Sequence, residues 1–98
     1  MASLRFEWDP AKARLNLTKH GISFEEAQTA FSDENAILLP DPEHSAHDER
    51  FVLIGLSVAL RVLVVVHCEP DRLGAVRLIS ARRATRSERS QYAARWKA

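Results

Sequence analysis

Cysteine, glycine and proline are scarce in this chain, which has one, three and four of them among 98 residues. The single cysteine, Cys68, cannot form an internal disulfide, and this excludes a disulfide-stapled secreted scaffold. The low glycine and proline content argues against a fibrous or disordered chain. The longest apolar run, residues 62–66, is too short to cross a bilayer, and residues 1–8 lack the layout of a signal peptide. We therefore expect one cytoplasmic domain over residues 1–98.

Acidic residues are scarce in the last third of the chain, and basic residues are scarce in its middle. Residues 71–98 contain eight Lys and Arg against two Asp and Glu, whereas residues 1–70 contain six against eleven. Residues 25–49 carry eight acids and no Lys or Arg. This asymmetry indicates one side that faces a polyanion and a separate acidic side for another partner. The alternative is that both blocks are solvated surface.

The first elements are predicted from local start and stop signals. Residues 4–8 alternate in period two, which is typical of a short strand. Asp9 then supplies an N-cap, and Pro10 suits the first helical position because its missing N–H costs nothing there. The helix is expected to run to about His20 and to end at Gly21, a residue that readily takes the left-handed conformation.

Two further helix starts carry the spacing of a capping box, in which a hydroxyl and a carboxylate three residues apart satisfy the first backbone N–H groups. Ser23 and Glu26 form the first box, and Thr85 and Glu88 form the second. The predicted helices cover residues 24–31 and 86–97.

Apolar stretches between these helices predict a sheet. The candidate strands are residues 35–40, 51–56, 61–69 and 75–83. The last three follow one another too closely for parallel crossovers, so we expect antiparallel hairpins. The predicted fold is therefore α+β with an antiparallel sheet, two N-terminal helices on one face and a C-terminal helix, in the order β-α-α-β-β-β-β-α.

Alternation divides the side chains of strand 61–69 between two faces. We expect the helices to cover the more apolar face, that of Val62, and to leave the face of His67 open. With a five-residue loop between this strand and the next, His67 faces Arg77, and Arg50 of the preceding strand lies on its other side. The sequence thus predicts a row of Arg50, His67 and Arg77 across the open face.

The same register places Arg61 opposite Arg83. Directly opposed cations destabilise a sheet unless an anion lies between them, and guanidinium groups bind phosphate bidentately. By strict alternation Ser80 and Arg82 fall on the other face from Arg77, although a bulge near Ser80 would change this. These arginines therefore indicate an RNA-binding sheet, to which Arg61, Arg82 and Arg83 contribute.

The predicted row suits RNA cleavage by the strand's own 2′-hydroxyl. This reaction needs a proton acceptor, a proton donor and positive charge on the phosphate. His67 supplies an imidazole for proton transfer, and Arg50 and Arg77 stabilise the transition-state charge. No metal or cofactor is needed, and DNA is excluded as a substrate because it lacks the 2′-hydroxyl. The alternative is a structural sheet histidine whose neighbouring arginines pair with carboxylates.

Sequence motifs at both ends resemble the BrnT toxin family. They read FEWDP at residues 6–10, KHGISFEEA at residues 19–27 and RLISARRAT at residues 77–85. The resemblance implies a small ribonuclease of RelE-like fold, the toxin of a type II toxin–antitoxin pair. It also implies an antitoxin partner of the BrnA type, with a ribbon-helix-helix domain through which alone the complex contacts DNA. One departure is the turn at residues 57–60, which is apolar where a polar turn is expected.

Three residues in helices and loops have competing interpretations. The resemblance makes Lys19 and His20 RNA contacts, although cations at a helix C-terminus also offset the helix dipole. We expect Asn16 to be a surface or packing residue of its helix rather than a catalytic one.

Two other function classes stay open on the sequence. The same arginines would serve a nucleic-acid-binding module that only grips phosphates. A metal-dependent hydrolase would be centred on His44 and His47, although their spacing fits no helix-borne zinc signature.

Overall fold

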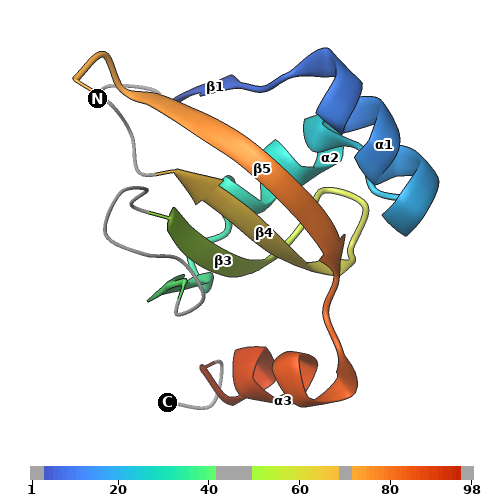
Figure 1. Cartoon of the computed structure of the whole chain (residues 1–98). Coiled ribbons are helices and arrows are strands. Elements are labelled where there is room, and N and C mark those ends of the chain that lie inside the picture. The colour runs from blue at the N-terminus through green and yellow to red at the C-terminus, as the bar shows by residue number, and fades with distance from the viewer. Residues whose placement is uncertain (1–3, 42–49, 69–71, 96–98) are drawn as a thin grey trace.

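A computed structural model describes residues 4–41, 50–68 and 72–95 of the chain. The elements in chain order are β1 (Arg5–Glu7), α1 (Pro10–His20), α2 (Phe24–Thr29), the 3-10 helix η1 (Ala30–Ser32), β2 (Ile37–Pro40), β3 (Arg50–Leu56), β4 (Val62–Cys68), β5 (Ala75–Arg83) and α3 (Arg86–Arg95). This order confirms the predicted α+β arrangement (Figure 1). Within the described ranges, no helix combines the length and apolar character that a bilayer crossing requires.

The three helices begin where their capping residues predict, and α1 also ends as predicted. The second predicted helix is shorter than expected, because α2 ends at Thr29 and continues as η1. The predicted end of the last helix near Lys97 lies outside the described residues. The Asp9 carboxylate accepts a hydrogen bond from the Ala11 N–H at 2.8 Å, and α1 ends at Gly21 with φ of 72°. Ser23 Oγ accepts from the Glu26 N–H at 3.0 Å. Each of these contacts satisfies a backbone group that a helix end otherwise leaves unpaired.

The box at the start of α3 is formed in both directions. The Thr85 N–H donates to Glu88 Oε1 at 2.7 Å, and the Glu88 N–H donates to Thr85 Oγ1 at 3.2 Å. At the start of α2 the carboxylate of Glu26 instead binds Arg61 and Ser57. The first box is therefore half formed, since its carboxylate contacts the β3–β4 turn.

The sheet has the strand order β1-β5-β4-β3-β2. Strands β2 and β3, β3 and β4, and β4 and β5 pair antiparallel, as the short connections predict. Strand β1 pairs parallel with β5, with Phe6 opposite Val76, so that the sheet is mixed. The short connections predicted only the pairing of strands that follow one another, whereas β1 and β5 come from opposite ends of the chain.

Helices α1 and α2 cover one face of the sheet, and α3 packs near the other (Figure 1). The core under α1 and α2 consists of Ile22, Phe24, Ala27, Leu63, Val65, Val76, Leu78 and Ala81. On the second face, Ile54 and Val64 pack with Ala84 and with Tyr92 of α3. The expectation that α1 and α2 cover the Val62 face is thus wrong. The covered face is chosen by β4 and β5 together, and β5 contributes Val76 and Leu78 to it.

The turn between β3 and β4 has three residues between its hydrogen-bonded ends. The Ser57 N–H donates to the Arg61 carbonyl at 2.9 Å, and the Leu60 N–H donates to the Ser57 carbonyl at 2.9 Å. Leu60 has φ of 63°, which completes a turn of the bulge-containing hairpin type. Leu56 consequently pairs with Val62, one residue beyond the expected partner Arg61.

Candidate functional site

The row of residues that crosses the second face at the end of β4 is Arg50, Cys68 and Arg77. Arg50 pairs with Cys68 on one side of β4, and Arg77 pairs with Cys68 on the other. Both neighbouring strands are shifted by one residue from the predicted register. A one-residue slip exchanges the faces of a strand, so His67 leaves the row. Because both neighbours shift alike, Arg50 and Arg77 still share one face, as predicted.

The expectation that His67 lies on an open face is wrong, because it lies on the face that α1 and α2 cover. Its side chain is 3% exposed and contacts the ring of Phe31 at a centroid distance of 4.8 Å. Phe51 lies on its other side at 6.4 Å, and Nδ1 is 3.3 Å from the Val65 carbonyl oxygen. Burial lowers the pKa of His67 below its usual value, so the neutral imidazole is favoured.

A β-bulge in β5 decides which of its side chains accompany Arg77. His67 pairs with Leu78, but Val66 pairs with Ser80, so that Ile79 is the extra residue. The bulge reverses the alternation, and Ser80 and Arg82 therefore lie on the same face as Arg77. Strict alternation would have placed them on the opposite face. One inserted residue thus brings Arg77 and Arg82 to the same face of the sheet.

A hollow of about 460 Å³ lies beside this row, between the sheet and α3. Its lining includes Val52, Val66, Ser80, Arg82, Glu88 and Gln91. Arg82 donates to both carboxylate oxygens of Glu88, at 2.8 and 2.9 Å. The hydrogen bonds from Arg82 lower the pKa of Glu88 to about 2. Glu88 is therefore ionised at neutral pH and holds the Arg82 guanidinium at the wall of the hollow.

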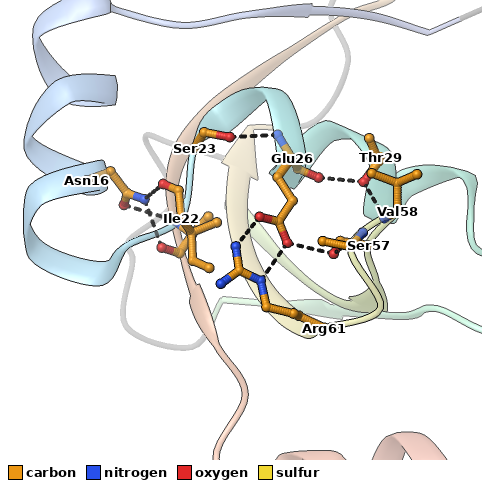
Figure 2. Close-up of polar contacts among 10 residues, drawn as sticks. Asn16, Ile22, Ser23, Glu26, Thr29, Ser57, Val58 and Arg61 are labelled. Atoms are coloured by element: carbon orange, nitrogen blue, oxygen red, sulfur yellow. Dashed lines mark hydrogen bonds and ion pairs between the residues drawn. The ribbon is translucent and has the colours of Figure 1, made fainter.

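Helix α1 is attached to the edge of β5 by Asn16. Its amide accepts from the Ala81 N–H at 3.0 Å and donates to the Ala81 and Ile22 carbonyls, both at 2.9 Å (Figure 2). Asn16 is 6% exposed, which confirms a packing role. This attachment starts four residues beyond Arg77, the last partner of β1. Asn16 thus takes over the hydrogen bonding of β5 where the edge strand has ended.

The end of α1 lies beside the bulge. A second hollow, of about 400 Å³, is lined by Lys19, His20, Ile79 and Ser80 among others. Lys19 is exposed and His20 is half-buried. The predicted RNA contacts Lys19 and His20 are therefore brought next to Ser80, which also lines the hollow between the sheet and α3.

Arg61 and Arg83 lie at the other end of the sheet. Arg83 pairs with Leu63, so the prediction that it faces Arg61 is wrong. Arg61 forms a two-point ion pair with Glu26, which includes Nε to Oε2 at 3.0 Å (Figure 2). Leu63 and Cys68 are five positions apart on β4, which corresponds to about 17 Å. Arg61 and Arg83 therefore form a second basic group, on the face that α1 and α2 cover and away from the row at Cys68.

Cys68 and Glu88 belong to the site, yet sequence reasoning did not place them there. Cys68 is a free, half-buried thiol that occupies the position predicted for His67. The capping spacing identified Glu88 as a helix-start residue, but its contact with Arg82 depends on the bulge. His44 and His47, the residues of the metal hypothesis, lie outside the described residues. Among the residues that are described, no three His, Cys, Asp or Glu form a metal-binding group.

Comparison with known proteins places this geometry in context. The family model described as the ribonuclease toxin BrnT of type II toxin–antitoxin systems matches residues 8–88. The crystal structure of the Brucella abortus ribonuclease toxin BrnT matches with a TM-score of 0.65 and 26% sequence identity. The match covers 86% of this chain and 100% of the Brucella chain. A search of curated proteins found no significant match.

Proposed function

Because this chain belongs to the BrnT family of ribonuclease toxins of type II toxin–antitoxin systems, we propose that it is a metal-independent endoribonuclease that acts on RNA laid across the second face of the sheet. The observation that carries the proposal is the placement of Arg50 and Arg77 on either side of Cys68. Two guanidinium groups on one face suit a phosphate that gains charge during reaction.

The proposed reaction is attack by the 2′-hydroxyl on its own 3′-phosphate. The bond from phosphorus to the 2′-oxygen forms, the bond to the 5′-oxygen of the next nucleotide breaks, and a 2′,3′-cyclic phosphate and a 5′-hydroxyl result. One proton leaves the 2′-hydroxyl and one reaches the departing 5′-oxygen. Arg50 and Arg77 stabilise the extra negative charge on the phosphate in the transition state. The step requires neither a water nucleophile nor a metal ion.

We assign proton transfer to His20 rather than to His67. An imidazole exchanges protons near neutral pH, but it must reach the substrate. His67 is enclosed by Phe31 and Phe51 on the covered face. His20 lines the hollow that contains Ser80, and Ser80 is on the face of Arg77. The buried position of His67 supports the structural interpretation that the sequence left open.

Lys19 and Arg82 complete the proposed RNA contacts. Lys19, at the end of α1, lines the same hollow as Ile79 of the bulge. Arg82 lines the hollow between the sheet and α3. Both cations would contact phosphates on either side of the cleaved bond, because successive phosphates follow the strand. Arg61 and Arg83 are left out of this assignment, since they lie on the face that α1 and α2 cover. Arg83 pairs with Leu63 of that core, and Arg61 binds Glu26 of α2.

The family implies an antitoxin partner for this toxin. We propose that the antitoxin is of the BrnA type, that its ribbon-helix-helix domain makes all contacts with DNA, and that toxin expressed alone slows growth by depleting RNA. Co-expression of the antitoxin is expected to restore growth.

The proposal is tested by incubating the purified chain with RNA, with and without EDTA, and by repeating the assay with Arg77→Ala. Cleavage that persists in EDTA and is lost in the variant supports it. Binding without cleavage supports a phosphate-gripping module instead. Cleavage that is abolished by EDTA would support the metal-dependent hydrolase centred on His44 and His47.

A further inference from the structure

The β3–β4 turn displays two apolar side chains to solvent. Val58 is 77% exposed and Leu60 is 79% exposed, although both belong to a hairpin tip, where polar residues are usual. Leu60 has φ of 63°, a conformation that favours glycine or asparagine. Among the described residues, it is the one non-glycine residue with a positive φ. A strained leucine at an exposed tip indicates that its side chain has a use.

The turn is held rigidly by α2. Ser57 Oγ donates to Glu26 Oε2 at 2.7 Å, and the Val58 N–H donates to Thr29 Oγ1 at 2.9 Å (Figure 2). Glu26 also binds Arg61 at the start of β4. These contacts fix the tip before any partner arrives, and a preorganised surface loses less conformational entropy on binding.

Positive charge lies on the Leu60 side of the apolar tip. A shallow hollow of about 250 Å³ is lined by Leu60, Arg61, Val62, Arg83, Ala84 and Arg89. Arg83 and Arg89 are exposed, and Arg89 is oriented by donating from Nη1 to the Ala84 carbonyl at 2.9 Å. Glu26 offsets one of the three arginines, so the hollow keeps excess positive charge. The surface therefore combines aliphatic contact area with guanidinium groups.

We propose that this surface, formed by Leu60, Arg83 and Arg89 and extended by Val58 of the same turn, is the docking site for an acidic, amphipathic segment of the antitoxin. The inference rests on the proposed toxin function and names where its partner binds. Acidic side chains complement the arginines, and apolar side chains of the same segment cover the tip. RNA accounts less well for the exposed Val58 and Leu60, because neither side chain offers a ring or a charge for a base or a phosphate.

The proposed docking surface lies at the opposite end of β4 from the proposed catalytic row. The tip lies at the end of β4 where Leu63 pairs with Arg83, whereas Arg50 and Arg77 flank Cys68 at the other end. An antitoxin segment that binds only the tip does not cover Arg50 and Arg77 at the other end of β4. Inhibition then depends on the part of the antitoxin that continues from the tip toward Cys68.

The test uses Leu60→Gly and Val58→Ser, with Leu73→Ser as the matched control. Leu73 is 76% exposed in the β4–β5 turn, so it has equal exposure at the opposite end of the sheet. Leu60→Gly is expected to raise the melting temperature by about 4–8 °C, because glycine takes the positive φ without strain. It is also expected to weaken binding of the cognate antitoxin at least tenfold, and Val58→Ser to weaken it severalfold. Leu73→Ser leaves the affinity unchanged.

A variant Leu60→Gly that is more stable and binds the antitoxin like the wild type overturns the docking surface. So does a variant that keeps the antitoxin but loses affinity for RNA, since the tip would then serve the substrate. RNA cleavage by each free protein is measured in parallel and is expected to be the same in all three variants. Absence of cleavage in the wild type would count against the proposed function and leave the antitoxin titration interpretable.

Discussion

Arg77 and Arg82 are five positions apart on β5, yet their side chains lie on the same face of the sheet. An odd separation places two residues of a regular strand on opposite faces. The extra residue Ile79 reverses the alternation between them, and it also brings Ser80 to that face. The polar side chains of β5 and the carboxylate of Glu88 thus meet on one surface. The inserted residue thus adds Ser80 and the Arg82–Glu88 pair to the face that already carries Arg77.

Replacement of Arg77 by alanine is expected to lower the RNA cleavage rate by about 10²–10³-fold, because one group that stabilises transition-state charge is lost. Arg77 is exposed, so the melting temperature is expected to stay near that of the wild type. Arg72→Ala is the control, since Arg72 is also an exposed arginine near β5. Single-turnover cleavage assays measure the difference, and equal rates for the two variants would remove Arg77 from the site.

Replacement of His67 by phenylalanine is expected to preserve cleavage within about twofold. A phenyl ring keeps the contacts with Phe31 and Phe51 and removes the ionisable group. His20→Ala is expected to lose about 10²–10⁴-fold, the range that positioned proton transfer contributes. The pH dependence of cleavage by the two variants separates the two imidazoles. A large loss in a folded His67→Phe protein would restore the catalytic role predicted from the sequence.

The pH dependence of stability is expected to report on His67. Its folded-state pKa lies below the unfolded value of about 6.5, because burial disfavours the charged form. The unfolded chain therefore binds a proton first, and this residue's contribution to stability is lost as the pH falls below about 6.5. Urea unfolding at pH 7.5, 6.5 and 5.5 measures the slope. The slope is expected to be shallower in His67→Phe, and an unchanged slope would show that folding does not shift the pKa of His67.

Glu88 titrates at lower pH and with the opposite structural cause. Its pKa is about 2 in the folded protein and about 4.3 in the unfolded chain. Its pairing with Arg82 therefore stabilises the folded protein fully at a pH above the unfolded-state pKa. That stability is lost as the pH falls from about 4.5 toward 2. We expect a contribution of about 1 kcal/mol at neutral pH, reduced by the partial exposure of Arg82. Unfolding of Glu88→Gln and the wild type at pH 7 and pH 3 measures it, and the difference between the two stabilities should be smaller at the lower pH.

Loss of the Asn16 amide is expected to destabilise the protein by about 3 kcal/mol, because the Ala81 N–H and two buried carbonyls would lack partners. Asn16→Ala is compared with Asn35→Ala, since Asn35 is exposed and its substitution should cost less than about 0.5 kcal/mol. Chemical denaturation gives both values. Similar stabilities for the two variants would mean that water replaces the amide at the edge of β5.

The starts of α1, α2 and α3 were predictable because capping is local. Asp9, Ser23 and Thr85 each bind backbone groups within three residues, and their spacing is visible in the sequence. The strands were predictable as apolar segments for the same reason.

The register of β4 was not predictable, because it depends on turns whose length the sequence leaves ambiguous. Leu60 is unusual at a positive φ, so the three-residue turn that it completes gave no signal. The one-residue error that followed moved His67 from the predicted site to the covered face. The sequence indicated only that a bulge near Ser80 would change the faces of Ser80 and Arg82. It did not predict the bulge, because nothing in the side chain of Ile79 requires one.

The parallel pairing of β1 with β5 has a consequence for when the molecule is completed during synthesis. Arg5 of β1 donates through Nη2 to the Leu73 carbonyl, 68 positions later in the chain, at 2.9 Å. Contacts of such long sequence separation form late, and a nascent chain that still lacks β5 has no partner for β1. The same missing strand carries Arg77 and Arg82. The pairing of β1 and the two β5 arginines of the proposed active face therefore depend on the same late segment, and a chain truncated before β5 keeps Arg50 but has neither.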